Sequence, residues 1–401
     1  MNSSINAYDR IVFLLIVSVV FGYLGSFFTS PIILFTVLFF FRFIRVFLPF
    51  FRKNQETVFV FIFLVVYSAV SLFWSPDFRH SLVLWIRAIF HILLCLEIIA
   101  FSQKAQKPLE SIANAWVFAV FLTACVAIWE MVTDNHLTVI AHQDLEMEIV
   151  RYRAAVTFYN NNTYSMFVVF SLPFLLYANQ KQKAGLLRLL NTLLLFLLIS
   201  IVLLNASRGA ILGLVIIIAV YTISIVNNGN SKYKRYAIFA ILLLSVFMLF
   251  ASSFLLETIL YRTEGRNYFY DSARTVLIQS SWQLFLQSFG MGQGFGSMIP
   301  ALAQFPGNTT SITYSHNLFL ELLLEGGVVF GIPFILLYFN LFKRAYKEND
   351  PSRKMFIYSV VLSLPICSII NSSYLSPTFI WVYFVSVYAF SSVKVPALEK
   401  V

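Results

Sequence analysis

Apolar runs alternate with short polar turns along the whole chain, on the scale of membrane-crossing helices. A helix of about 20 apolar residues crosses the roughly 30 Å hydrocarbon core of a bilayer. About twelve runs reach that length, with centres near Val19, Phe39, Val65, Phe90, Leu122, Phe170, Leu195, Ile216, Leu244, Phe330, Val360 and Tyr383. The pattern predicts an all-α polytopic membrane protein with one integral membrane domain over residues 1–401.

The lysines fix the expected orientation of these helices. Every lysine falls in an even-numbered turn or in the C-terminal tail when the N-terminus is taken as cytoplasmic. This is the positive-inside pattern, so we expect both termini in the cytoplasm. The first apolar run starts after Arg10 and lacks a small-residue cleavage site, which favours an uncleaved first span over a signal peptide.

Two outward loops are long enough to carry a site. A first outward loop covers residues 133–162, and a long outward loop covers residues 254–315, between the ninth and tenth spans. A loop of roughly sixty residues in so compact a protein is usually functional. We therefore look for the chemistry of this protein on the outward side.

Composition agrees with a membrane protein and argues against a nucleic-acid-binding protein. The chain is 59% hydrophobic and 11% charged, and its mean hydropathy is +0.81. The net charge of +10 is scattered between apolar runs without a basic stripe, so no nucleic acid partner is expected. Cys95, Cys125 and Cys367 fall inside apolar runs and are expected to be buried small hydrophobes.

Arginine replaces lysine on the outward side, at Arg79, Arg151, Arg153, Arg208, Arg262, Arg266 and Arg274. The guanidinium group binds phosphate with two parallel hydrogen bonds and stays charged at any pH. These arginines therefore indicate an anionic ligand, although ion pairs with loop carboxylates are an ordinary alternative. Arg208 and Arg153 lie at span mouths without an adjacent acid, which favours a ligand there.

Three of these arginines belong to two short polar clusters. Arg208 lies in a turn of small residues between two spans, where a tight polar turn is the structural alternative. Residues 151–162 join Arg151 and Arg153 to three consecutive asparagines, whose donors and acceptors suit sugar hydroxyls. A helix-capping turn before the sixth span explains the asparagines equally well.

The junction at His316-Asn317 joins the long loop to an apolar span. Ser315 is a plausible N-cap, which would start the helix at His316. Asn317, Glu321 and Glu325 form one polar stripe at a spacing of four, and the carboxylates are expected to face protein or water because lipid disfavours them. Glu321 is badly placed to orient His316, so an orienting partner is expected from another segment. A simple interfacial anchor is the alternative role of this histidine.

Other motifs narrow the chemistry further. Glycine occupies every second position from Gly290 to Gly296, but no strand precedes it and no Lys-Ser follows, which excludes a nucleotide loop. These glycines suit a sharp turn or a close backbone approach. Neither a zinc-ligand spacing nor an Asp-x-Asp pair occurs, so we expect no cofactor and metal-independent chemistry.

These clusters, in this order, resemble the O-antigen ligase superfamily, which includes O-antigen ligases and related polysaccharide polymerases. The similar region covers residues 151–331. The matching pieces are Arg153 to Asn162, Ser207-Arg208-Gly209, Arg274 ahead of the alternating glycines, and His316-Asn317 leading to Glu325.

The resemblance implies an inverting, metal-independent glycosyltransferase of glycosyltransferase C-type architecture in the bacterial cytoplasmic (inner) membrane, with its active site outward. The donor would be a glycan on polyprenyl pyrophosphate, whose lipid tail lies between spans, and the acceptor a hydroxyl of a glycolipid or glycan. His316 would be the general base, with an ordinary pKa of roughly 6.5, and Arg208 would stabilise the leaving pyrophosphate. The expected substrate-binding residues are Arg151, Arg153, Asn160, Asn162, Arg274, Asn317, Glu321 and Glu325.

Two alternatives remain open from the sequence. A polymerase would join two lipid-linked glycans, whereas a ligase would use a lipid A-core sugar in lipopolysaccharide or surface polysaccharide assembly, and we lean slightly to the ligase. A transporter of lipid-linked sugars would place ionisable residues near the membrane midplane, for which Glu97 and Glu130 are candidates. The absence of an internal repeat in the sequence favours the enzyme.

Overall fold

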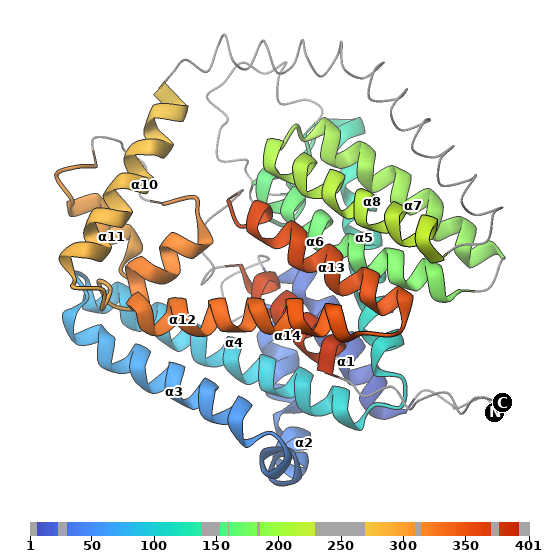
Figure 1. Cartoon of the computed structure of the whole chain (residues 1–401), viewed down its shortest axis with the longest axis horizontal. Helices are drawn as coiled ribbons and strands as arrows, with labels where there is room; N and C mark the ends of the chain where they lie inside the picture. Colours follow the sequence, from blue (N-terminus) through green and yellow to red (C-terminus); the bar gives the residue numbers. More distant parts are fainter. Residues whose placement is uncertain are drawn as a thin grey trace.

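The computed structural model describes residues 6–22, 30–137, 153–158, 160–182, 185–228, 269–308, 314–369 and 377–392. Every regular element in these ranges is a helix (Figure 1). The helices are α1 (Ala7–Val17), η1 (Ser18–Phe21), α2 (Pro31–Lys53), α3 (Gln55–Ser71), η3 (Leu72–Trp74), α4 (Phe78–Lys104), α5 (Pro108–Thr133), α6 (Asn161–Lys181), α7 (Leu186–Leu204), α8 (Arg208–Asn228), α10 (Phe269–Gln287), α11 (Met298–Gln304), α12 (Leu318–Lys347), α13 (Pro351–Cys367) and α14 (Thr378–Ser392).

The chain is an integral membrane protein. Among the described residues, seven helices are long and apolar enough to cross a bilayer, namely α2, α3 with η3, α4, α5, α7, α8 and α12. Each predicted span centre in the described ranges falls inside a helix, and the centre near Leu244 lies outside them. The total of about twelve spans stays a prediction.

The core is organised around α6, which is buried on nearly every side. A helix that is apolar all round belongs inside a bundle, and α5, α7, α8 and α13 pack against α6. Aromatic stacking fixes its register, since the Trp116 and Phe174 rings lie 5.1 Å apart and are almost parallel. Large apolar side chains on the outside of α2, α3 and α7 are exposed, as expected where lipid replaces water.

One sequence prediction about the core is wrong. Cys95 and Cys367 are buried, but Cys125 on α5 is exposed on the outside of the bundle. Both the lipid-facing and the bundle-facing sides of a membrane helix are apolar, so hydrophobicity did not distinguish the two sides.

The two ends of the bundle differ in chemistry. At one end Asp9 of α1 accepts hydrogen bonds from the Gln106 and Lys107 amides, and Lys181 pairs with Asp350 at 2.8 Å. We call this the lysine end. The opposite end, where α6, α8 and α12 begin, holds the described site residues, and we call it the site end. The long segment predicted as a loop over 254–315 contains two helices, α10 and α11, in its described part.

Candidate functional site at one end of the bundle

A single asparagine joins the two polar clusters around Arg153 and Arg208. Asn205, between α7 and α8, is fully buried. Its Oδ1 accepts from the Ala154 amide at 2.9 Å, and its Nδ2 donates to the Ala154 carbonyl at 3.0 Å. Asn161 at the start of α6 donates through Nδ2 to the Asn205 carbonyl at 3.3 Å. The segment after Arg153 and the turn before Arg208 are therefore held against each other.

A buried carboxylate fixes the same segment from the other side. Glu130, near the end of α5, accepts through Oε2 from the Ala155 and Val156 amides at 2.9 Å each. Its Oε1 accepts from the Leu137 amide at 3.0 Å. Glu130 therefore anchors the backbone at the site end, which corrects its candidacy as a midplane transport residue. Residues 154–158 form a buried segment, and Val156 within it lies in the left-handed region, at φ 53°.

Arg208 and the asparagines lie at helix N-termini. Arg208 is the first residue of α8, its side chain is exposed, and it forms no ion pair with a carboxylate among the described residues. Asn160 caps α6, accepting from the Asn162 amide at 2.7 Å. The helix-capping interpretation of these asparagines is thus confirmed for Asn160. Arg151 lies outside the described residues.

The start of α12 differs from the sequence prediction. Asn317, and not Ser315, is the N-cap, and its Oδ1 accepts from the Phe319 and Leu320 amides at 3.0 and 3.2 Å. The helix therefore begins at Leu318, and His316 lies two residues earlier in the left-handed region, at φ 52°. That backbone is unfavourable for a residue with a Cβ. The prediction failed because serine and asparagine are almost equally good N-caps.

The electrostatic environment of His316 keeps its ring neutral. Burial lowers the pKa of His316 to about 4, and the positive charge of Arg274 on α10 lowers it in the same direction. The ring Nδ1 atom is buried and has no hydrogen-bond partner among the described residues. The imidazole at neutral pH is thus an unprotonated base beside a guanidinium group. Its pKa is well below the ordinary value assumed from the sequence.

The two carboxylates of α12 face protein, as predicted. Glu321 is fully buried and accepts from the Ser315 hydroxyl at 3.2 Å, so it holds the residue directly before His316. Glu325 is also buried, and accepts from the Gly296 amide at 3.0 Å and from the Met298 amide at 3.3 Å. Glu325 therefore positions backbone, and Glu321 holds the side chain of Ser315. A role in substrate binding stays a prediction for both.

The alternating glycines form a turn that docks on a break in α12. Their φ angles are all positive, from 71° to 96°. Gly327 interrupts α12 with φ 59° and ψ −152°. A Cβ on Gly292 would meet the Glu325 carbonyl oxygen at 2.6 Å, so only glycine permits this approach. The glycines therefore serve backbone contact within the chain, one of the two uses predicted for them.

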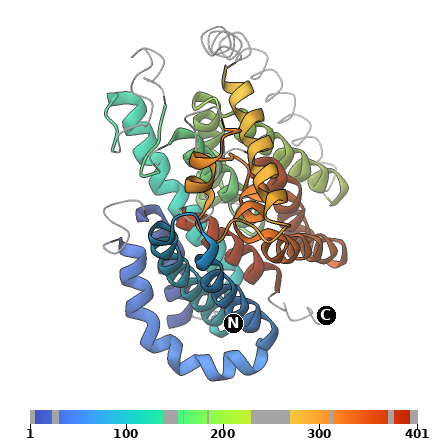
Figure 2. The same cartoon turned by 90° about the vertical axis from the view of Figure 1, so that its left-hand side faces the viewer.

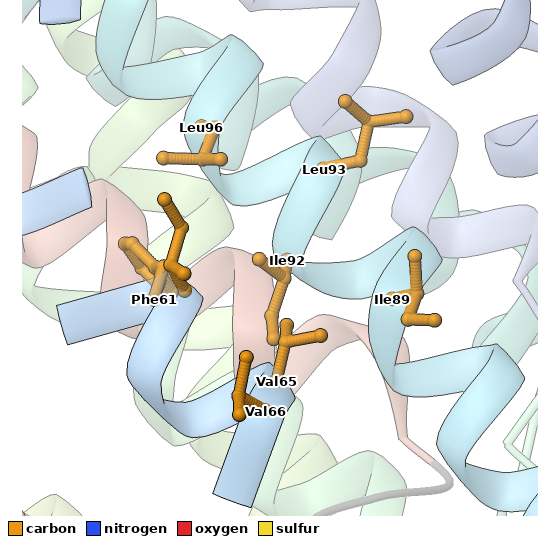
Figure 3. A pocket seen from close by; sticks show the side chains of 8 residues that line it. Phe61, Val65, Val66, Ile89, Ile92, Leu93 and Leu96 are labelled. Carbon is orange, nitrogen blue, oxygen red and sulfur yellow. The ribbon is translucent and has the colours of Figure 1, made fainter. Parts of the chain in front are cut away.

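Helix α3 carries the other side of the glycine turn. The Tyr67 hydroxyl donates to the Met291 carbonyl at 3.0 Å, and the Trp74 indole donates to the Gly292 carbonyl at 3.2 Å. An apolar groove of about 250 Å³ lies between α3 and α4 (Figure 3). Its lining is Phe61, Ile62, Val65, Val66, Ile89, Ile92, Leu93 and Leu96.

Helix α13 connects the two halves of the site end. The Leu318 amide of α12 donates to the Ser368 carbonyl at 3.0 Å, just past the end of α13. Next to it, Cys367 packs so tightly on Gly213 of α8 that an added Cβ would lie 2.7 Å from its sulfur. The starts of α8 and α12 thus share one neighbour, and α12, α13 and α8 lie in succession in Figure 1.

Sequence reasoning missed the residues that organise this end. Asn205 was only part of a turn motif, although a lone asparagine after a long apolar run signals a buried hydrogen-bonding role. Tyr67 and Trp74 were not singled out from the sequence. Their polar atoms were the available signal, because the tyrosine hydroxyl and the tryptophan N–H usually find a hydrogen-bond partner where the rest of the ring packs against apolar groups.

Comparisons with known proteins point to one family. Residues 193–335 match the family model described as O-antigen ligase. This range starts in α7 and ends in α12, so it contains Asn205, Arg208, Arg274, the glycine turn and His316. The teichuronic acid biosynthesis protein TuaE of Bacillus subtilis (strain 168) is 24% identical over 349 residues, which cover 82% of this chain and 70% of that protein.

Proposed function

From the place of this chain in the O-antigen ligase superfamily, carried by residues 193–335, we propose that it is a membrane glycosyltransferase. It transfers a glycan from polyprenyl pyrophosphate to a sugar hydroxyl of a glycolipid or glycan. The reaction takes place at the site end, on the outer face of the bacterial cytoplasmic membrane. The lysines at the other end support this orientation, because lysine is enriched on the cytoplasmic side. The similarity to this family and the membrane-spanning helices support a role in polysaccharide assembly. The lipid-linked donor and the sugar acceptor are what we propose beyond that.

The observation that carries the proposal is the neutral imidazole of His316 beside the Arg274 guanidinium. A general base must be unprotonated and able to reach the proton it removes. In the proposed reaction the acceptor oxygen attacks the anomeric carbon and its proton goes to His316. The bond between that carbon and the pyrophosphate oxygen breaks, and the configuration inverts because the displacement is direct.

The arginines of the site end supply the charge that the leaving group needs. We assign Arg208 to the pyrophosphate because it is exposed at the N-terminus of α8, where backbone amides and the helix dipole also favour an anion. Arg153 directly precedes Ala154, which Asn205 holds beside this turn. Arg151 stays a predicted binding residue from the sequence. Arg274 has two effects, since it faces the same anion and keeps His316 neutral.

The remaining predicted residues bind or position the sugars. Asn160, Asn162 and Asn317 lie at the starts of α6 and α12, where their side-chain amides can contact sugar hydroxyls. Glu325 positions backbone of another segment, and Glu321 holds the Ser315 hydroxyl. The apolar groove between α3 and α4 suits the polyprenyl tail, because it is lined only by aliphatic and aromatic side chains and its Val66 adjoins Tyr67, which binds the glycine turn (Figure 3).

A polymerase that joins two lipid-linked glycans is the second candidate. The similarity to TuaE favours keeping it, because that relative is named for the biosynthesis of teichuronic acid and not of O-antigen. Donor, base and arginines are the same in both reactions. The two differ only in whether the acceptor hydroxyl belongs to a finished glycolipid or to another lipid-linked glycan.

The test is a polysaccharide gel of a strain lacking this chain, complemented with the wild-type protein or with His316→Ala. Loss of the whole attached glycan supports the ligase, and attachment of one repeat unit supports the polymerase. His316→Ala should insert normally and restore neither product. Full complementation by that variant, or an unchanged gel in the deletion strain, would refute the proposal.

A purified system tests the metal-independent part. The protein in bilayer nanodiscs, given a lipid-pyrophosphate glycan and an acceptor, should form product equally well with and without a chelator. A loss of turnover that returns with a divalent cation would contradict a reaction run by His316 and the arginines alone.

A further inference from the structure

The C-terminal half of α2, residues 42–53, runs across the bundle at the lysine end. Phe43 contacts Phe101 of α4, with ring centroids 6.4 Å apart. Eleven positions later, Asn54 and Gln103 exchange two side-chain hydrogen bonds of 3.1 and 2.8 Å. Phe101 and Gln103 differ by about 3 Å along α4, whereas eleven residues of helix extend about 16 Å. This half of α2 therefore lies across α4 and not alongside it.

The views of the whole chain agree with these contacts. Figure 1 looks nearly down the axis of α2 at its label, while α3, α4 and α12 extend across the picture. Figure 2 shows α2 curving around the outside of the neighbouring helices. Length and composition place α2 among the helices able to cross a membrane. Its contacts instead keep residues 42–53 at one depth, level with the last turns of α4.

Three kinds of side chain occupy three sectors of this half-helix. Phe43, Val46 and Phe50 are buried against the bundle. At about 100° per residue, a second sector holds Ile44 and Leu48, which are 51% and 64% exposed. Phe41, just before this half-helix, extends the same sector and is 72% exposed.

The third sector is cationic. It contains Arg42, Arg45, Arg52 and Lys53, all exposed. None of the four forms an ion pair with a carboxylate among the described residues. The cationic sector adjoins the exposed apolar one, so a single helix presents hydrocarbon on one side and positive charge on the next.

We propose that residues 42–53 are an interfacial helix that binds anionic phospholipid head groups at the lysine end. A helix with adjacent exposed apolar and cationic sectors lies in the plane of a bilayer surface, with the apolar side in the acyl region. Arginine matches the paired oxygens of a phosphodiester. A protein partner would bury the apolar and cationic sectors together, whereas a bilayer surface separates them by depth, as the sectors are arranged here.

The experiment uses the full chain in nanodiscs of phosphatidylcholine with phosphatidylglycerol, and measures the phosphatidylglycerol that copurifies after exchange into detergent. The double variant Arg42→Gln/Arg45→Gln should retain less, by about fivefold per charge removed near an anionic surface. The matched control Lys343→Gln/Lys347→Gln removes two exposed cations from α12 at the same end. Equal losses in both variants would reduce the effect to net charge and overturn the proposal.

Two further measurements keep the outcome clear if the first variant is unstable. Arg42→Lys/Arg45→Lys keeps the charge and should retain most of the lipid. A fluorophore on Leu48→Cys, in a Cys125→Ser background, should be quenched by nitroxides at head-group depth. Quenching by nitroxides at the bilayer centre would show that this half of α2 crosses the membrane. If the α2 substitutions leave the retained phosphatidylglycerol unchanged, the cationic sector binds another partner. Either result overturns the proposal.

Discussion

The Asn205 side chain pairs with both backbone polar groups of Ala154, accepting from its amide at 2.9 Å and donating to its carbonyl at 3.0 Å. The two residues are 51 positions apart. This pair joins the segment of Arg153 to the turn of Arg208, so the two guanidinium groups are arranged by a residue that itself carries no charge.

Replacing Asn205 should therefore damage activity more than stability. Asn205→Ala leaves the buried Ala154 groups without their side-chain partner, at a cost of about 1–3 kcal/mol. Thermal unfolding and glycan transfer should be measured together. Asn191→Ala is the control, because Asn191 of α7 is also buried but donates to the Gln182 side chain, just past the end of α6, at 3.2 Å. A control variant as inactive as Asn205→Ala would contradict the positioning role.

The glycine turn offers a matched pair of substitutions. Gly290 and Gly292 have nearly the same φ, 78° and 80°. An added Cβ on Gly290 would have no neighbour closer than 3.7 Å, whereas on Gly292 it would meet backbone atoms at 2.6 Å. Gly290→Ala should cost about 1–2 kcal/mol from left-handed strain alone. Gly292→Ala should cost about 1–3 kcal/mol more, because the turn must separate from α12. Equal melting temperatures of Gly290→Ala and Gly292→Ala would contradict the close packing of the glycine turn on α12.

The acid limb of the pH–rate profile should report on His316. Its pKa is lowered to about 4, so the base stays unprotonated and kcat/KM stays level as pH falls from 7 toward 5. Activity should fall only as pH approaches 4, where the imidazole takes a proton. Arg274→Gln removes a positive charge, which raises the pKa of His316 and moves the acid limb to higher pH. Arg274→Lys keeps the charge and should leave the limb in place; a limb near 6.5 in the wild type would contradict this environment.

Substitution of Arg208 by lysine separates charge from shape. Lysine keeps the positive charge but cannot form two parallel bonds to a pyrophosphate. Arg208→Lys should therefore lose turnover almost as fully as Arg208→Ala, while the melting temperature changes little because the side chain is exposed. Initial rates with saturating donor are the measurement. Normal turnover in Arg208→Lys would contradict paired hydrogen bonding to the pyrophosphate and show that Arg208 contributes only its positive charge.

The sequence predicted the helical membrane fold, because period and length are properties of the chain itself. It also marked the two clusters of Arg153 and Arg208, whose segments Asn205 joins; their convergence with His316 on one substrate stays a prediction. It did not predict which apolar face meets lipid, as Cys125 shows. Nor did it reveal that Arg274 lowers the pKa of His316. That effect depends on how α10 packs against α12, which no local pattern encodes.

Hydrogen-bonding roles were also hidden from the sequence. Glu130 and Glu325 looked like residues for transport or substrate, yet each binds backbone amides of another segment. A buried carboxylate needs hydrogen-bond partners wherever it lies. The sequence reveals the carboxylate but not which amides it will bind. The N-cap of α12 was misplaced by two residues for the related reason that Ser315 and Asn317 both have suitable oxygens.

Glu325 provides the last test, because its carboxylate holds Gly296 and Met298, and so the start of α11, against α12. Glu325→Gln keeps the size but replaces one accepting oxygen with a donor, so one buried amide loses its partner at a cost of about 1–3 kcal/mol. If Glu325 positions α10 and α11, Arg274 should move relative to His316. The acid limb should then shift to higher pH, together with a lower kcat.

A contact with substrate predicts a different result from the same variant. Loss of a sugar contact would raise KM and leave the acid limb near 4, where the environment of His316 sets it. Glu110→Gln at the exposed start of α5 is the control for charge, since it removes one carboxylate at the lysine end. A shifted acid limb in Glu325→Gln but not in Glu110→Gln would assign Glu325 to positioning, whereas a pure change in KM would return it to the substrate.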